Sequence, residues 1–260
     1  MKLQLLVSAV NQEPETLIES MNIRTDAIIV NQCDKHDYRE FSVENGIVRF
    51  YSFKERGVGL SRNNALLRAS EDLVLFSDED IVYDDDYEQK VSEAFAMHPE
   101  ADMLLFNMDV CESRRTYDIR KFGRVHWYNC GRYPTYSFAA RRERLHKAGV
   151  TYSLLFGGGA KYSAGEDSLF IRDCLKKGLR IYCIPVKIGR EQERESTWFR
   201  GYNEKYFFDR GVLYHFLYGK LAIPMSWRLI VAKKSFMCKE ISAKKALALM
   251  KKGILHAKNM

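Results

Sequence analysis

The chain has 260 residues, 46% hydrophobic and 29% charged, which is the composition of a folded globular protein with a substantial core. It contains no apolar run of about 18 residues, so no membrane-spanning helix is expected. Its six cysteines are scattered without a Cys-x-x-Cys pair, which argues against a zinc site and predicts reduced thiols in a cytosolic compartment.

The net charge of +7 is concentrated at one end of the chain. Residues 219–260 hold ten Lys or Arg and one acid, Glu240, a net +9, whereas residues 1–218 hold 31 basic and 33 acidic residues, a net −2. This asymmetry is typical of a tail that binds an anionic surface. A nucleic-acid-binding protein is the alternative, but the body is near neutral and has no basic groove motif.

The N-terminal residues predict alternating strands and helices. Residues 3–9 are expected to form a strand, because Gln4 interrupts the apolar run and makes it too short for a signal peptide. A helix is expected to begin between Asn11 and Pro14, and further strands are expected at 26–30 and 46–51. This order predicts an α/β fold with a mostly parallel sheet flanked by helices.

The segment 56–67 combines a Gly-x-Gly turn at Gly57 and Gly59 with the start of a helix. A dinucleotide fingerprint would need a third glycine where Arg62 stands, so a Rossmann oxidoreductase is not expected. Near a helix N-terminus, Arg62 could instead face a diphosphate, since the helix dipole also favours anions there. The alternative is an arginine that is solvated on an exposed helix face.

Residues 73–80 are four apolar residues followed by Ser77 and three acids. We interpret them as a buried parallel strand that delivers carboxylates at the sheet edge. In extended backbone, Asp78 and Asp80 would point the same way and could hold Mg²⁺ or Mn²⁺, which usually arrives with a phosphate. The alternative is a polar loop that follows a strand.

The second half predicts a helix to about Met97, strands at 102–106, 136–140 and 179–185, and a short helix at 141–147. Residues 111–132 give no assignment. Three glycines at 157–159 allow a tight bend or close approach to a sugar, and Glu166 and Asp167 open a helix that runs to Lys177. Both acids could also serve as plain helix caps.

Segments 56–67, 73–80 and 156–167, in this order, resemble family-2 glycosyltransferases of the GT-A fold. The resemblance covers roughly residues 3–200 and implies a catalytic domain at 1–200, with a nucleotide-sugar half at 1–107 and an acceptor half at 108–200. Residues 201–260 would form a helical, basic region that could associate with a membrane.

The resemblance implies roles for individual residues. Asp167 would be the catalytic base with Glu166 beside it, Asp80 would hold the metal, and Asp78 would contact the ribose or the metal. The donor would be bound by a further set of residues: Ala9, Asn11, Asp34, Arg62, Asn63, Gly158, Arg190 and Trp198. Two departures stand out: Asn31 and Gln32 replace the usual Asp at the base-binding strand end, and Arg190 stands where many relatives have a His.

The implied activity is inverting transfer of a sugar from a nucleoside diphosphate, expected to be UDP, to an acceptor hydroxyl with Mn²⁺ or Mg²⁺. A lipid-linked or polysaccharide acceptor in cell-surface glycan synthesis is expected, with the enzyme cytoplasmic and peripheral on the inner face of the membrane. A nucleotidyltransferase is the alternative enzyme, but residues 8–14 lack its basic, Gly-rich signature.

The segment 212–232 is apolar but broken by Lys220, Pro224 and Arg228. Such a pattern predicts helices at a membrane interface with aromatic anchors rather than a membrane span. The alternative is that 202–232 packs on the catalytic body while the lysines are solvated.

Overall fold

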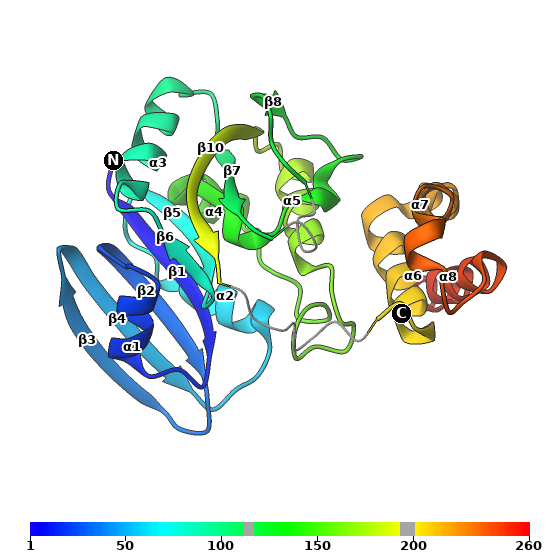
Figure 1. The fold of residues 1–260 in the computed structure, drawn as a ribbon, viewed down its shortest axis with the longest axis horizontal. Coiled ribbons are helices and arrows are strands. Elements are labelled where there is room, and N and C mark those ends of the chain that lie inside the picture. Colours follow the sequence, from blue (N-terminus) through cyan, green and yellow to red (C-terminus); the bar gives the residue numbers. More distant parts are fainter. Residues whose placement is uncertain (112–116, 193–200) are drawn as a thin grey trace.

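The computed structural model describes residues 1–111, 117–192 and 201–260. Within these residues ten strands form one mixed sheet in the order β3-β4-β2-β1-β5-β9-β7-β10-β6, with β8 paired to β10. Helices cover both faces of the sheet, and three C-terminal helices lie to one side of it (Figure 1).

The strands are β1 (Leu3–Val10), β2 (Thr25–Gln32), β3 (Asp37–Val43), β4 (Asn45–Phe53), β5 (Leu73–Asp78), β6 (Ile81–Tyr83), β7 (Met103–Asp109), β8 (Gly123–Arg124), β9 (Phe138–Arg141) and β10 (Ile181–Glu191). The helices are α1 (Pro14–Ser20), α2 (Val58–Arg68), α3 (Tyr87–Met97), α4 (Arg142–Ala148), α5 (Glu166–Lys176), α6 (Glu204–Tyr218), α7 (Ala222–Met237) and α8 (Ala243–Lys258). Short 3-10 helices are η1 (Cys130–Arg132), η2 (Thr135–Ser137) and η3 (Gly219–Leu221).

The parallel core of the sheet confirms the strands expected from apolar runs. β1 pairs in parallel with β2 and β5, and β2 pairs in parallel with β4. β1, β2 and β5 are buried on both faces, so their sequences are mostly apolar, whereas β4 is buried only at alternate residues. β3 and β6 were not expected from the sequence: β3 is a largely polar, antiparallel strand beside β4, and β6 has three residues paired antiparallel to β10.

Two apolar layers lie on opposite faces of the sheet. One includes Leu17 of α1 and Val91 of α3. The other includes Leu66 of α2 and Phe170 of α5. Because both layers press on β1 and β5, these strands are fixed and can present functional groups at their carboxyl ends with little freedom to move.

A third apolar cluster joins α6, α7 and α8 to the segment that precedes α5. Leu213 of α6 packs so closely on Gly165 that an added Cβ would lie 2.5 Å from its methyl carbons. Asp209 of α6 accepts hydrogen bonds from the backbone N–H and hydroxyl of Ser163, both at 3.2 Å. The C-terminal helices therefore support the loop that leads into α5.

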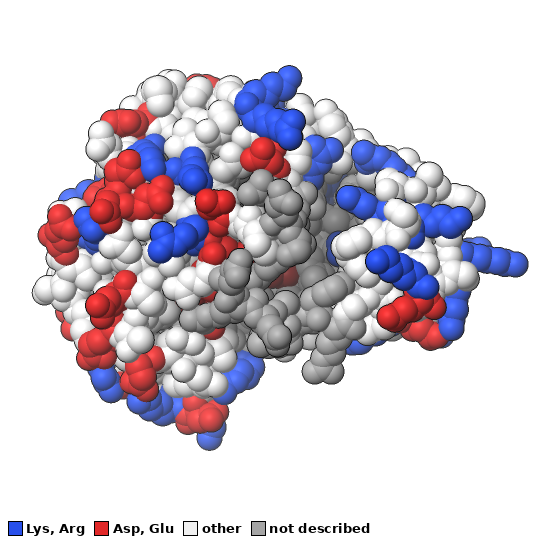
Figure 2. Space-filling view, viewed as in Figure 1, with Lys and Arg blue, Asp and Glu red and all other residues white. Residues whose placement is uncertain are grey.

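Basic side chains gather over the C-terminal helices, whereas acids and bases mix on the body (Figure 2). Among the described helices, none combines the length and the apolar character that a membrane crossing requires.

Candidate active site

The candidate site lies where the carboxyl ends of β1 and β5 meet the first turns of α2 and α5. Ser8 and Asp78 are neighbours in the register of β1 and β5. Arg62 is the fifth residue of α2, and Glu166 and Asp167 are the first two residues of α5. Four charged groups from three distant parts of the chain thus converge at one edge of the sheet.

Arg62 is the centre of this group and is only 3% exposed. Its Nη2 lies 2.7 Å from Oδ1 of Asp78, and its Nη1 lies 3.1 Å from Oε1 of Glu166 and 2.9 Å from Oδ1 of Asp167. Burial alone would lower the pKa of Arg62, but the three carboxylates outweigh burial and raise it well above the usual value. The guanidinium is therefore a permanent buried cation, and the solvated alternative is wrong.

Tyr152 contributes an aromatic face to the same cation. The Cζ atom of Arg62 lies 5.3 Å from the centre of the Tyr152 ring, which itself stacks on Phe170 at 4.0 Å. Asn63 fixes the backbone of Tyr152, because its amide donates to the Tyr152 carbonyl at 2.9 Å and accepts from the Tyr152 N–H at 2.7 Å. The Asn63 side chain thus joins α2 to this segment.

Glycines let the backbone approach the cluster closely. At Gly59, an added Cβ would lie 2.5 Å from the backbone oxygen of Ser153, so a side chain there would push α2 away. Gly157 has φ +105°, and a Cβ there would lie 2.8 Å from Cδ of Glu166. The Gly158 carbonyl accepts a hydrogen bond from the Val58 N–H at 3.0 Å, so the glycine loop and the start of α2 hold each other.

Asp167 is held by one oxygen and open at the other. Both Arg62 Nη1 and the hydroxyl of Thr135 donate to Oδ1. None of the described residues forms a hydrogen bond with Oδ2, and the side chain is 26% exposed. An oriented carboxylate with one available oxygen is the geometry that a general base needs.

Glu166 differs from its neighbour in burial and in proton affinity. Its side chain is 11% exposed, and Oε2 accepts a hydrogen bond from the Gly165 N–H at 3.0 Å. Burial and the adjacent charge of Asp167 raise the pKa of Glu166 to about 7, although Arg62 opposes the shift. Near neutral pH the cluster can therefore hold an extra proton on Glu166.

This shift has a consequence for stability that a Glu166→Gln variant should reveal. The pKa of Glu166 rises on folding from 4.5 to about 7, so the folded wild type holds a proton that the unfolded chain has released, and the wild type loses stability as pH rises through this window. The Glu166→Gln variant has no carboxyl group to titrate at this position, so it does not lose stability in this way. Its free energy of unfolding relative to wild type should increase from about pH 5 to about pH 8, as measured by urea denaturation. The exposed Glu143→Gln is the control, and a difference that does not change with pH would contradict the assignment.

The acids after β5 do not continue the strand. β5 ends at Asp78, and the chain turns at Glu79 and Asp80 before β6 begins. Oε2 of Glu79 accepts a hydrogen bond from the Val10 N–H at 2.6 Å, and the Asp80 carbonyl accepts from the Gln192 N–H at 2.7 Å. The expected strand alternation over Asp78–Asp80 is therefore absent, because the chain must leave β5 to pair β6 with β10.

The side chains at the end of β5 supply the kind of oxygen donors that a divalent cation prefers. Asp78 and Asp80 are half-buried carboxylates at one strand end, which suits a hard cation that takes its remaining ligands from water and phosphates. The described residues include no group of three or more His, Cys, Asp or Glu arranged to hold a metal. A metal at this site would therefore depend on the diphosphate for part of its coordination.

The residues expected to contact the nucleoside lie around the ends of β1 and β2. Ala9 is buried in β1, so only its backbone can face a ligand. Asn11 is exposed with φ 51°, and its N–H donates to the Gln32 carbonyl at 3.1 Å. Asp34 is exposed and lies 3.2 Å from Nη2 of Arg56. The Gln32 side chain is already engaged, since its Oε1 accepts from the Gly57 N–H at 2.6 Å.

Arg190 lies in β10, opposite Val82 of β6, and is exposed. It lines a surface hollow with Asp109, Val110 and Cys111, and among the described residues no contact joins it to the Arg62 cluster. Trp198 lies outside the described residues.

Thr135 and Tyr152 complete the cluster, and neither was expected there from the sequence. Thr135 contacts Asp167 from η2, and Tyr152 contacts Arg62 from the segment after α4. Neither residue belongs to a charged or glycine-rich motif, so their residue types carried no signal of a role.

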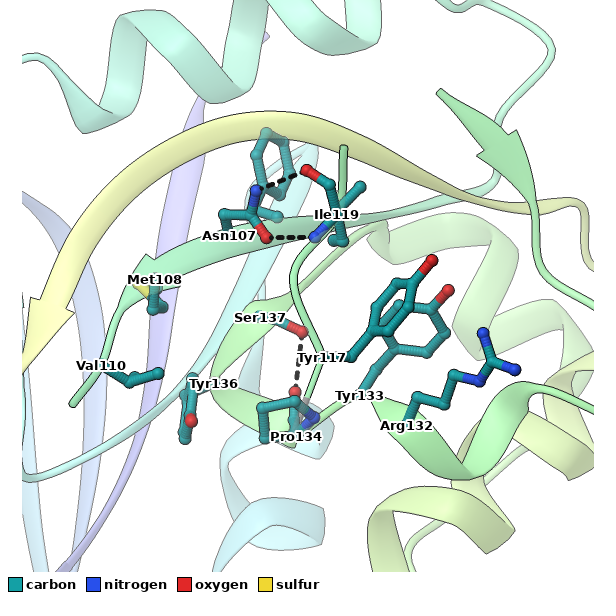
Figure 3. A pocket seen from close by; sticks show the side chains of 11 residues that line it. Asn107, Met108, Val110, Tyr117, Ile119, Arg132, Tyr133, Pro134, Tyr136 and Ser137 are labelled. Atoms are coloured by element: carbon teal, nitrogen blue, oxygen red, sulfur yellow. Dashed lines mark hydrogen bonds between the residues drawn. The ribbon is translucent and has the colours of Figure 1, made fainter. Parts of the chain in front are cut away.

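A small hollow of about 20 Å³ adjoins η2 (Figure 3). Pro134 and Tyr136, the two neighbours of Thr135, line it. The Tyr117 and Tyr133 rings contact each other at 5.6 Å, with the Arg132 guanidinium 5.1 Å from the Tyr117 ring. Asn107 fixes one wall, because its amide makes two hydrogen bonds with the backbone of Ile119. The hollow is thus an aromatic pocket next to the candidate base.

The sequence profile described as Glycosyl transferase family 2 matches residues 4–159, more than half of the chain. No curated protein matches this chain. Among solved structures, S. aureus TarS 1–349 in complex with UDP-GlcNAc is similar, with TM-score 0.64 and 14% identity over 99% of this chain and 79% of that one. S. aureus TarS 1–349 without that ligand gives TM-score 0.63 and 13% identity over 98% of this chain and 81% of that one. The fold is that of GT-A glycosyltransferases, and the chain belongs to glycosyl transferase family 2.

Proposed function

We propose that this glycosyltransferase moves a sugar from a UDP-sugar to an acceptor hydroxyl with inversion at the anomeric carbon. The observation that carries the proposal is the position of Asp167, whose Oδ1 is held by Arg62 and Thr135 while Oδ2 is available. In the proposed reaction Oδ2 removes the proton from the acceptor hydroxyl as the oxygen attacks the sugar. Because Asp167 would act only as a base and would not attack the anomeric carbon itself, the acceptor oxygen would displace the nucleoside diphosphate in a single step. A single displacement inverts the configuration at that carbon.

The similar structures support the choice of donor. TarS structures are described with UDP-GlcNAc and with UDP, and both share the fold of this chain. We propose that a UDP-sugar binds across the carboxyl ends of β1, β2 and β5. There the backbone of Ala9 and the side chains of Asn11 and Asp34 lie at the nucleoside end, with Asp78 closer to the sugar.

We propose that Asp80, with Asp78, holds Mn²⁺ or Mg²⁺ against the diphosphate. When bound, the cation neutralises charge that develops on the departing diphosphate. Arg62 keeps Asp78, Glu166 and Asp167 together at fixed positions around the donor. The carboxylates of Asp78, the last residue of β5, and of Asp80 match the ligands that such a cation prefers.

The acceptor is proposed to be a glycan, either a polysaccharide or one linked to a lipid. Sugar rings pack well on aromatic side chains, and Tyr117, which is 42% exposed and contacts Tyr133 beside η2, offers such a surface. Arg132 at its rim could bind a phosphate or carboxylate on such an acceptor.

The proposal is tested by incubating the protein with a panel of UDP-sugars and Mn²⁺ and measuring release of UDP. One donor should be hydrolysed faster than the others, and transfer to added glycans should increase the rate. Formation of a UDP-sugar from UTP and a sugar phosphate, without donor hydrolysis, would establish the nucleotidyltransferase alternative instead.

Metal dependence gives a separate prediction. The Asp80→Asn variant should lose most of its transfer activity, because the cation supplies several kcal/mol of charge stabilisation in such reactions. It should also lose the Mn²⁺-dependent part of UDP binding measured by calorimetry, while its circular dichroism spectrum stays that of wild type. Full transfer by wild-type protein in excess chelator would contradict the prediction.

A further inference from the structure

The helix α7 presents an exposed apolar line along one side. Ile223, Trp227 and Val231 are spaced four residues apart, so they lie along the same face of the helix. Their exposed fractions are 46%, 57% and 69%. Single exposed apolar residues are ordinary, but three in line on one helix form a continuous surface that is costly to leave in water.

An apolar cleft adjoins this line. It lies between α7 and α8, is lined by Ile223 and Trp227 on one side and by Leu247 and Ile254 on the other, and has a volume of about 160 Å³. Lys251 of α8 lines it as well. The exposed line and the cleft together form one surface, which we call the α7–α8 face.

The charge around this face is almost entirely positive. Lys220, Arg228, Lys234 and Lys251 are all exposed on or next to α7 and α8. Residues 219–260 contain a single acid, Glu240, and a net charge of +9. Basic side chains cover this part of the molecule in Figure 2. The face therefore combines apolar groups with a positive rim.

The arrangement of the three helices leaves the α7–α8 face outward. α6 contacts the body through Leu213 on Gly165 and Asp209 on Ser163, and α8 contacts it through His256, whose Nε2 lies 3.2 Å from the Tyr162 hydroxyl. α7 packs on α6 and α8, and its side with Ile223, Trp227 and Val231 stays exposed. The alternative from the sequence, packing on the body, thus holds for α6 and not for the exposed side of α7.

We propose that the α7–α8 face docks on an anionic lipid bilayer, with Ile223, Trp227 and Val231 entering the headgroup region and the surrounding basic residues binding anionic lipids. Apolar residues flanked by lysines on an amphipathic helix have this use, and Trp is favoured at the interface. A second copy of the chain is a poorer partner, because two faces of high positive charge would repel. Nucleic acid would not engage Ile223 or Val231. The proposal does not depend on the reaction proposed above.

Full-length protein should co-sediment with vesicles of phosphatidylglycerol and phosphatidylcholine at low salt. It should not do so with phosphatidylcholine alone, and high salt should release it. The Lys251→Glu variant should bind at least about fivefold more weakly, since one basic residue near such a surface contributes that factor. The exposed Lys147→Glu of α4 is the matched charge control and should bind as the wild type does.

The apolar line needs its own test. Val231→Ser should weaken vesicle binding about tenfold, whereas the control Leu67→Ser, at an exposed leucine of α2, should not. Trp227 fluorescence should shift to shorter wavelength on anionic vesicles and be quenched by brominated lipids, and this change should disappear in Trp227→Phe.

Three results would overturn the proposal: no binding of wild type to anionic vesicles at low salt, binding that Val231→Ser leaves unchanged, or a wild-type dimer in sedimentation equilibrium that Val231→Ser dissociates. The last result would make the face a subunit interface. Vesicle binding needs no donor, so its failure would leave the sugar-transfer assay unaffected.

Discussion

The Asp167→Asn variant is expected to lose about 10²–10⁴-fold in the rate of sugar transfer, the usual effect of removing a general base. The amide oxygen can still accept the hydrogen bonds that Arg62 and Thr135 donate to Oδ1, so the cluster should keep its shape. The Asn cannot take a proton from the acceptor. Turnover measured with saturating donor should fall, while UDP-sugar affinity measured by calorimetry should stay near the wild-type value.

Two further variants separate the base from its surroundings. Thr135→Val removes the hydroxyl that orients Asp167, so it should lower turnover less than Asp167→Asn does. Glu166→Gln should retain more activity than Asp167→Asn, because the Glu166 side chain is more buried than that of Asp167, 11% against 26% exposed, and less able to reach an acceptor. An inactive Glu166→Gln beside an active Asp167→Asn would show that the two roles are exchanged.

The Arg62→Met variant is expected to lose about 3–5 kcal/mol of stability, the cost of removing one partner from a buried ion pair. Met keeps much of the side-chain volume but leaves Asp78, Glu166 and Asp167 facing one another without a cation. Urea denaturation at neutral pH should show the loss. The loss should shrink at lower pH, because protonation of the carboxylates relieves their repulsion.

The control for this variant is an arginine in an exposed ion pair. Arg39→Met removes the partner of Asp37 on β3, where both side chains are more than a third exposed, and should cost at most about 1 kcal/mol. Arg62→Lys keeps the positive charge, but a single ammonium nitrogen cannot reach all three carboxylates as the two guanidinium nitrogens do. The stability of this variant should therefore lie between those of wild type and Arg62→Met. Equal stability of Arg62→Met and wild type at neutral pH would contradict the central role of Arg62.

The parallel core of the sheet could be predicted from the sequence because strands buried on both faces must be apolar throughout. The segment Leu73–Phe76 shows this, and β5 lies where it was expected. The edge strand β3 could not be found in the same way, since one exposed side leaves it largely polar and only its pairing with β4 defines it. Backbone pairing, unlike burial, leaves little trace in residue type.

The residues of the candidate site could also be predicted from the sequence only in part. Arg62, Asp78, Glu166 and Asp167 stand in three segments whose glycines, acids and order along the chain can be recognised from the sequence, although each segment alone also allows a purely structural role. Their convergence on one buried guanidinium, across 104 positions between Arg62 and Glu166, depends on how the helices pack on the sheet. The contacts of Thr135 and Tyr152 arise only there, since each is an ordinary residue that the fold places beside a charge.

In the C-terminal region the sequence predicts some properties, and tertiary packing decides the others. Its charge and its broken apolar pattern are properties of the sequence, and they indicate a surface-binding helical segment without reference to any contact. Which helix is buried is decided by tertiary packing: Leu213 meets Gly165 and turns α6 inward, while Trp227 on α7 stays 57% exposed. Both helices are rich in apolar residues, and only the shape of the body determines which of them it covers.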